Sequence, residues 1–95
     1  MAKRISEQST VVAVKEQVST GLDGEAVILQ LKQGIYYGLD SVGMRVWDMV
    51  RVPRKVSEIR DSLVKEYPVQ PDRCRRDLLV LLGQLKEAGL IDVKG

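Results

Sequence analysis

The chain has 95 residues, of which 44% are hydrophobic and 29% are charged, and its formal net charge is +2. This length and balance are typical of one small globular domain with a single core. The chain contains no histidine and one cysteine, Cys74, so it lacks the commonest general base and cannot form an internal disulfide or a thiolate metal cluster. We therefore expect neither catalysis nor a metal or cofactor.

The N-terminus is polar and lacks the apolar run of a signal peptide. We expect a flexible segment over residues 1–9 and a single domain over residues 10–95. No stretch approaches the length of a membrane-spanning helix, so the sequence predicts a cytoplasmic protein with a reduced thiol and no membrane partner.

The first part of the chain has the pattern of short strands joined by tight turns. Asp23-Gly24 is a strong hairpin signal, because both residue types tolerate positive φ angles, and Lys32-Gln33-Gly34 predicts a second reversal. The predicted strands therefore form a three-stranded antiparallel meander. They span residues 17–22, 25–31 and 35–39, preceded by a strand or lead-in over residues 10–14.

After residue 39 the apolar period changes to that of helices. Asp40 or Ser41 can cap the first helix, and Ser57 is a candidate cap for the second. The predicted helices run from Val42 to near Val52, from Val56 to Tyr67, and from Pro71 to Ala88, with Gly89 as the stop and a short apolar segment, residues 90–93, packed back on the fold. The fold class is α+β: a β-meander followed by three α-helices, as in a winged helix-turn-helix-like domain.

The third helix carries more apolar residues than one stripe needs. Its stripe comprises Cys74, Leu78, Leu81, Leu82 and Leu85, which span an ordinary width for a helix packed on a core. Leu79 and Val80 lie outside that stripe. Burial between two neighbouring elements and participation in an interface both explain the excess.

Several short segments, taken together in their order along the chain, resemble the PqqD family. The upstream matches are residues 22–29, residues 34–40 (Gly-Ile-Tyr-Tyr-Gly-Leu-Asp), Gly43 and Trp47. The downstream matches are residues 56–59, Leu63, residues 67–69, Asp77, Leu81, Leu82, Leu85 and residues 89–91. The resemblance covers nearly all of residues 11–93 in the expected order.

This resemblance implies a small, non-catalytic winged-helix domain that recognises precursors of ribosomally synthesised and post-translationally modified peptides (RiPPs). In that family the leader of the precursor adds as a strand to the third strand of the sheet, here residues 35–39, in the groove against the third helix. The Tyr-Tyr-Gly-Leu strand is more similar to the stand-alone lasso-peptide group, which implies a separate leader peptidase and cyclase as partners. A radical-SAM enzyme would be the partner in a quinone-type pathway.

Alternation along the last strand separates its side chains into two sets. We assign Ile35, Tyr37 and Leu39 to the core and Tyr36 to the groove or the surface, while Gly38 would let a peptide backbone approach closely. Cross-strand packing is an equally simple role for the two tyrosines. The candidate leader-binding residues are Ile35, Tyr36, Tyr37, Gly38, Leu39, Cys74, Asp77, Leu78 and Leu81.

Two of these candidates have an alternative interpretation. Asp77 can accept a hydrogen bond from the peptide or pair with a basic side chain of it, and it can equally form an ion pair with Arg73 or Arg76 in its own helix. Cys74 is a small buried residue or, alternatively, a reactive thiol.

Other function classes remain open. A DNA-binding winged helix would use the basic start of the third helix, where Arg73, Arg75 and Arg76 lie. A homodimerising scaffold would use the same open sheet edge on a second copy of itself. With the peptide-binding role, we expect a monomer or a weak homodimer and no nucleic-acid partner.

Overall fold

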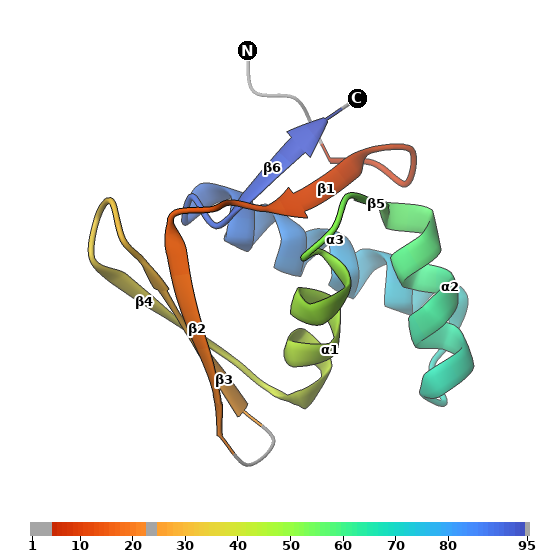
Figure 1. The fold of residues 1–95 in the computed structure, drawn as a ribbon. Coiled ribbons are helices and arrows are strands. Elements are labelled where there is room, and N and C mark those ends of the chain that lie inside the picture. The colour runs from red at the N-terminus through yellow and green to blue at the C-terminus, as the bar shows by residue number, and fades with distance from the viewer. Residues whose placement is uncertain (1–4, 23–24, 95) are drawn as a thin grey trace.

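The computed structural model describes residues 5–22 and 25–94 (Figure 1). It confirms the α+β class, with a three-stranded antiparallel meander followed by helices. The likeness to winged helix-turn-helix domains stays a prediction. In chain order the elements are β1 (Thr10–Ala13), β2 (Gln17–Leu22), β3 (Glu25–Gln30), β4 (Ile35–Leu39), α1 (Ser41–Met49), β5 (Arg54–Lys55), α2 (Val56–Glu66), α3 (Pro71–Glu87) and β6 (Ile91–Lys94).

The meander consists of β2, β3 and β4 in that spatial order. Leu22 lies opposite Glu25, and the residues between them, where the sequence predicts the first turn, lie outside the described residues. The second turn is confirmed: Gly34 has a φ of 67° and its amide donates to the carbonyl of Gln30 at 2.8 Å. Glycine suits this position because L side chains rarely adopt positive φ.

A second sheet, which the sequence patterns did not predict, has the order β5-β1-β6. β1 is therefore the central strand of this second sheet and does not belong to the meander. It lies antiparallel to both of its neighbours. The apolar segment after α3 packs back on the fold as predicted, since Leu90 and Ile91 are buried and β6 pairs with β1. This second sheet joins the two ends of the described chain.

The first helix begins, and the third begins and ends, as the sequence predicts, whereas α1 ends at Met49, a few residues before the predicted end near Val52. The Asp40 carboxylate caps α1 by accepting the amide of Gly43 at 2.8 Å. Pro71 occupies the first turn of α3, where a missing amide hydrogen costs nothing, and Gly89, with a φ of 72°, follows its last turn.

The second helix begins differently from the prediction. It starts at Val56, so Ser57 lies inside the helix and is not its cap. The first two amides, of Val56 and Ser57, instead donate to the carbonyls of Ser9 and Glu7 at 3.0 and 3.1 Å. The N-terminal segment therefore satisfies the start of α2 with its own backbone.

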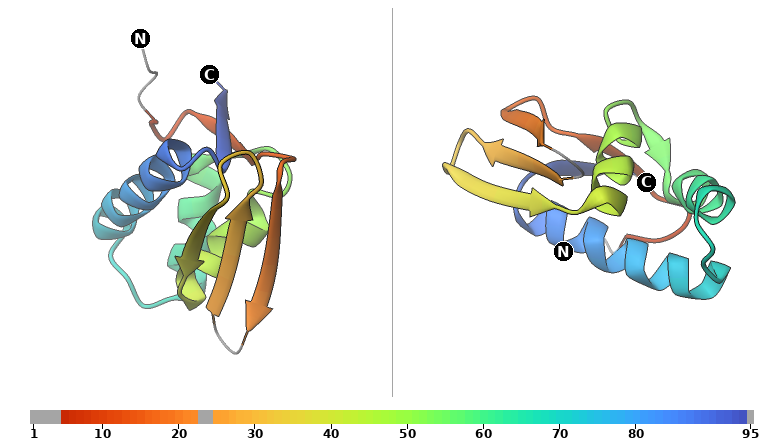
Figure 2. Two further views of the ribbon diagram at one scale, coloured as in Figure 1. Left: turned by 90° about the vertical axis from the view of Figure 1, so that its left-hand side faces the viewer. Right: turned by 90° about the horizontal axis from the view of Figure 1, so that it is seen from below.

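The helices lie on one side of the meander (Figure 2). The inner face of β3 presents Ile28 to the core, where it is fully buried together with Trp47 of α1, Ile59 of α2 and Leu82 of α3. Both views place β4 as the strand of the meander next to α3. This arrangement sets the edge of β4 and one side of α3 against each other.

Candidate functional site

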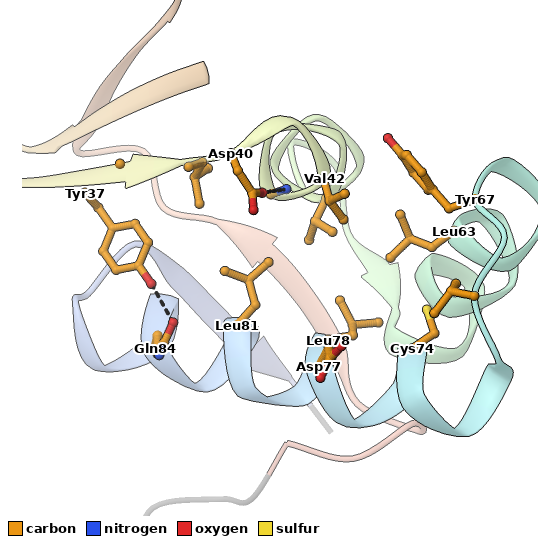
Figure 3. A pocket seen from close by; sticks show the side chains of 15 residues that line it. Tyr37, Asp40, Val42, Leu63, Tyr67, Cys74, Asp77, Leu78, Leu81 and Gln84 are labelled. Atoms are coloured by element: carbon orange, nitrogen blue, oxygen red, sulfur yellow. Dashed lines mark hydrogen bonds between the residues drawn. The ribbon is translucent and has the colours of Figure 1, made fainter. Parts of the chain in front are cut away.

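A groove of about 490 Å³ lies between β4 and α3 (Figure 3). The start of α1 and the end of α2 complete its walls. Its lining is mostly apolar, with a few polar groups, which is typical of ligand sites. The lining residues are Tyr37, Gly38, Leu39, Asp40, Val42, Gly43, Val46, Leu63, Tyr67, Val69, Cys74, Asp77, Leu78, Leu81 and Gln84.

The first wall is the edge of the meander. Among the described residues β4 pairs with β3 alone, so alternate amides and carbonyls of β4 point to a side that has no strand partner. A Cβ atom placed on Gly38 would meet nothing within 4 Å, so the backbone there is open to close approach. This edge can therefore accept another strand.

The second wall is one side of α3. Cys74, Asp77, Leu81 and Gln84 recur every three or four residues and so share one side of the helix. Leu82 and Leu85 lie on the neighbouring side and are fully buried in the core. The helix therefore has apolar residues toward two neighbours, the core and the groove.

The residues outside the predicted stripe of α3 divide between the core and the surface. Leu79 packs against the core, whereas Val80 is 61% exposed. Burial between neighbouring elements thus explains Leu79. Val80 is a surface side chain.

The floor of the groove comes from the first turns of α1 and the end of α2. Gly43 allows α1 to follow β4 closely, since a Cβ atom there would lie 3.0 Å from Leu39 Cδ2. On the opposite side, Leu63 and Tyr67 of the α2 end reach toward the same space (Figure 3). The floor is therefore apolar and is assembled from segments distant in sequence.

One hydrogen bond connects the two walls. The Tyr37 hydroxyl of β4 donates to Gln84 Oε1 of α3 at 2.8 Å (Figure 3). Burial raises the pKa of the Tyr37 hydroxyl, which keeps this group protonated and able to donate at neutral pH. The pair closes one end of the groove.

The charged groups of the groove are carboxylates. Asp40 and Asp77 line it, and none of the lining residues in the described chain is lysine or arginine. Asp77 Oδ2 lies 3.7 Å from Arg73 Nε, and both side chains are more than 70% exposed. The predicted ion pair within α3 is therefore present, and Asp77 also faces the groove.

Cys74 lies in the groove wall as a buried, free thiol. Burial raises the pKa of this thiol, and the nearby Asp77 carboxylate raises it further, while Arg60 lowers it. The neutral thiol is therefore the stable form, which agrees with a small packed residue rather than a reactive nucleophile.

The structure brings most of the predicted site residues together. Ile35 and Tyr36 do not line the groove, and their side chains are 45% and 71% exposed. The assignment of Ile35 to the core is therefore wrong, because this first residue of β4 lies beyond the end of the packed region, whereas that of Tyr37 and Leu39 agrees with their burial. The predicted residues that line the groove are Tyr37, Gly38, Leu39, Cys74, Asp77, Leu78 and Leu81.

Sequence reasoning missed the rest of the lining. Gln84 continues the three-residue spacing from Leu81 and could have been found from that signal. The residues that α1 contributes follow the predicted strand directly, whereas those from the α2 end come close only through the tertiary fold. The missed residues are Asp40, Val42, Gly43, Val46, Leu63, Tyr67, Val69 and Gln84.

Two other kinds of site are missing from residues 5–22 and 25–94. This part of the chain contains no group of three or more cysteine, aspartate or glutamate side chains placed to hold a metal ion. None of its helices is both long and apolar enough to cross a membrane.

The family follows from a comparison with known proteins. Residues 25–91 match the family described as coenzyme PQQ synthesis protein D (PqqD). The chain belongs to the PqqD family. The match runs from β3 of this PqqD-family chain to the start of β6, and so includes both walls of the groove.

Two solved structures are similar to this PqqD-family chain. TbiB1, in complex with the TbiA(beta) leader peptide, is 34% identical with a TM-score of 0.79, and the match covers 85% of this chain and 94% of TbiB1. A lasso peptide synthetase B1, complexed with the leader peptide, shares the fold with a TM-score of 0.76 at 22% identity, over 86% and 96% of the two chains. A comparison with curated proteins gave no match.

Proposed function

We propose that this protein binds the leader segment of a RiPP precursor by adding it as a strand to β4, in the groove against α3. The observation that carries this proposal is the unpaired edge of β4 beside a mostly apolar groove. The leader-bound state of TbiB1, a relative of the same fold, supports the choice of ligand.

Strand addition divides recognition between the backbone and the side chains. The five residues of β4 present an edge of roughly 17 Å, at about 3.3 Å per residue, and pairing along it supplies affinity without regard to sequence. Alternate side chains of the peptide then point into the groove, where Leu78, Leu81 and Val42 offer apolar contacts. Selectivity arises from these contacts.

The proposed role is to hold the leader without changing it. The chemistry would come from partner enzymes, a leader peptidase and a cyclase of the lasso type, which act on the peptide that this protein presents. The cytoplasm suits such a role, because precursors are made there by ribosomes and Cys74 stays reduced.

Gly38→Pro tests strand addition directly. The proline ring removes an amide and adds bulk at the open edge, so we expect it to abolish binding of the leader. The probe is a synthetic leader peptide that binds the wild-type chain, with the TbiA(beta) leader bound by the 34% identical TbiB1 as the first choice. The measurement is isothermal titration calorimetry.

The matched control is Gly83→Ala on α3. A Cβ atom there also meets nothing within 4 Å, and Gly83 does not line the groove, so leader affinity should be unchanged. Circular dichroism establishes that each variant is folded. Wild-type affinity in a folded Gly38→Pro variant would rule out strand addition at β4.

The alternative of a DNA-binding protein is disfavoured by an ion pair of one of its basic residues. Arg75 Nε lies 3.3 Å from Glu7 Oε1, so this arginine at the basic start of α3 already has an acidic partner within the protein. Binding of Arg75 to a phosphate would have to replace this contact. A DNA complex would weaken steeply with salt, whereas a peptide held by backbone pairing should respond only modestly.

A further inference from the structure

We propose that the peptide accepted by this groove carries a lysine or arginine among its apolar residues, and that Asp77 and Asp40 select for it. This inference rests on the proposed function and names the chemical class of its ligand. The groove binds the peptide, and the two carboxylates determine which charge on a peptide side chain is favoured.

The charge of the groove lining has one sign. Asp40 and Asp77 are the charged members of the lining set, and they come from different walls, one at the junction of β4 with α1 and the other on α3 (Figure 3). A peptide strand between these walls passes both carboxylates. An acidic side chain on that strand would meet two like charges, whereas a basic one would meet two opposite charges.

The Asp77 carboxylate already has a partner, but a weakly held one. Arg73 lies on the same helix at 3.7 Å, and the exposure of both side chains makes this ion pair weak. Arg73 can therefore turn into solvent at little cost when a ligand cation arrives. The negative charge of Asp77 is also felt inside the groove, where it disfavours ionisation of the Cys74 thiol.

The Asp40 carboxylate is held in place by the helix that it caps. Its Oδ1 atom accepts the amide of Gly43 at the start of α1, which fixes the side chain at the groove. A carboxylate has several acceptor positions, so this cap leaves room for another donor. Asp40 is thus a fixed acceptor, in contrast with the exposed pair of Asp77 and Arg73.

The shape of lysine and arginine suits an apolar groove with carboxylates on its walls. Their long aliphatic stems pack on apolar surface while the charged head reaches polar groups at the edge. Leu78 and Leu81 line the same wall as Asp77 and provide such a surface. A basic residue next to apolar anchors therefore uses both parts of the site.

Selection from random peptides tests this inference, because it does not require the natural ligand to be identified. A display library of random peptides of about 12 residues, long enough to cover β4 with flanking residues on both sides, is panned on the full chain. Parallel selections use Asp77→Asn, Asp40→Asn, Asp77→Lys and the control Asp72→Lys. Asp72 lies in the first turn of α3 and does not line the groove.

We expect wild-type and Asp72→Lys selections to enrich lysine or arginine at one position among apolar residues. Asp77→Lys should shift that position to aspartate or glutamate. For one selected peptide, replacing the basic residue by glutamine should weaken binding to the wild type by about 2- to 5-fold, and by less than that to Asp77→Asn. Asp40→Asn keeps an acceptor for the cap and should reduce the same preference.

The outcomes separate this inference from the function on which it rests. Apolar peptides that show no preference for basic residues, yet lose binding to Gly38→Pro, would leave the function standing and overturn the charge selection. An absence of enriched peptides, or enrichment that Gly38→Pro does not reduce, would count against the function itself. Thermal unfolding checks that each variant is folded. If Asp77→Lys does not fold, the loss of preference in Asp77→Asn still tests the inference.

Discussion

At the scale of single residues, the hydrogen bond between Tyr37 and Gln84 joins β4 to α3 at one end of the groove. Side chains of a strand added to β4 would enter the groove between these two elements. We therefore expect a peptide that pairs along the whole of β4 to compete with this bond. A hydrogen bond of this kind makes a net contribution to stability of about 0.5–1.5 kcal/mol.

Tyr37→Phe removes the hydroxyl and keeps the ring in the groove. We expect the leader to bind about 2- to 10-fold more tightly, because the free protein no longer loses this bond on binding. Surface plasmon resonance measures both the affinity and the association rate, which should rise.

Gln84→Met supplies the matched partner variant. It should give the same gain, and the double variant should gain no more than either single one, because all three lack the same bond. Weaker binding to both single variants would instead mean that the tyrosine hydroxyl and the glutamine amide contact the peptide.

At the scale of elements, the junction of β4 with α1 depends on one side chain. Asp40 caps α1 through the amide of Gly43, and the close approach of Gly43 to Leu39 holds the strand and the helix together. Because this junction forms one corner of the groove, loosening it affects both stability and the site.

Asp40→Ala removes the cap and should destabilise the protein by about 1 kcal/mol. For a chain of this size that corresponds to a fall in Tm of roughly 4–8 °C. Asp40→Asn is the control, since asparagine also caps helices and should leave Tm close to that of the wild type. Differential scanning calorimetry makes the comparison, and equal Tm values for the alanine and asparagine variants would show that the cap contributes nothing.

Local chemistry explains which elements could be predicted from the sequence. The turn at Gly34, the cap at Asp40 and the helix stop at Gly89 each depend on a residue type with a specific conformational or hydrogen-bonding role. Ser57 was not the cap because carbonyls of Glu7 and Ser9, distant in sequence, satisfy the first amides of α2. The second sheet was missed for the same reason, since it pairs β1 with β5 from the middle of the chain and with β6 from its far end.

The site was predictable to the extent that it follows strand and helix periodicity. Alternation placed Tyr37 and Leu39 on the inner face, and helical spacing placed Cys74, Asp77 and Leu81 on one side of α3. Tyr36 has the opposite phase and is 71% exposed, on the outer face. The contribution of the α2 end carries no such signal, because it depends on how α2 packs on its neighbours.

At the scale of the whole molecule, the N-terminal segment connects two helices. Glu7 forms ion pairs with Arg60 of α2 and Arg75 of α3, while its carbonyl accepts an amide from the start of α2. Residues 5–9, which the sequence assigned to a flexible segment, thus contact the fold. These contacts lie outside the groove lining.

Glu7→Gln tests whether this connection matters for stability. The variant loses both ion pairs, so we expect Tm to fall by a few degrees while leader affinity stays at the wild-type value. The control is Glu16→Gln, an exposed position just before β2, which should leave Tm unchanged. Unchanged Tm in Glu7→Gln would mean that the backbone contacts alone hold the segment.

The position of α3 has a consequence for the growth of the sheet at β4. A strand edge that is left unpaired invites indefinite growth, in which each added strand exposes a new edge to the next. Because α3 lies alongside β4, a strand added there, as we propose, would meet a helix that offers no further edge. The wall that shapes the groove would thus also limit the number of strands that the sheet accepts on this side.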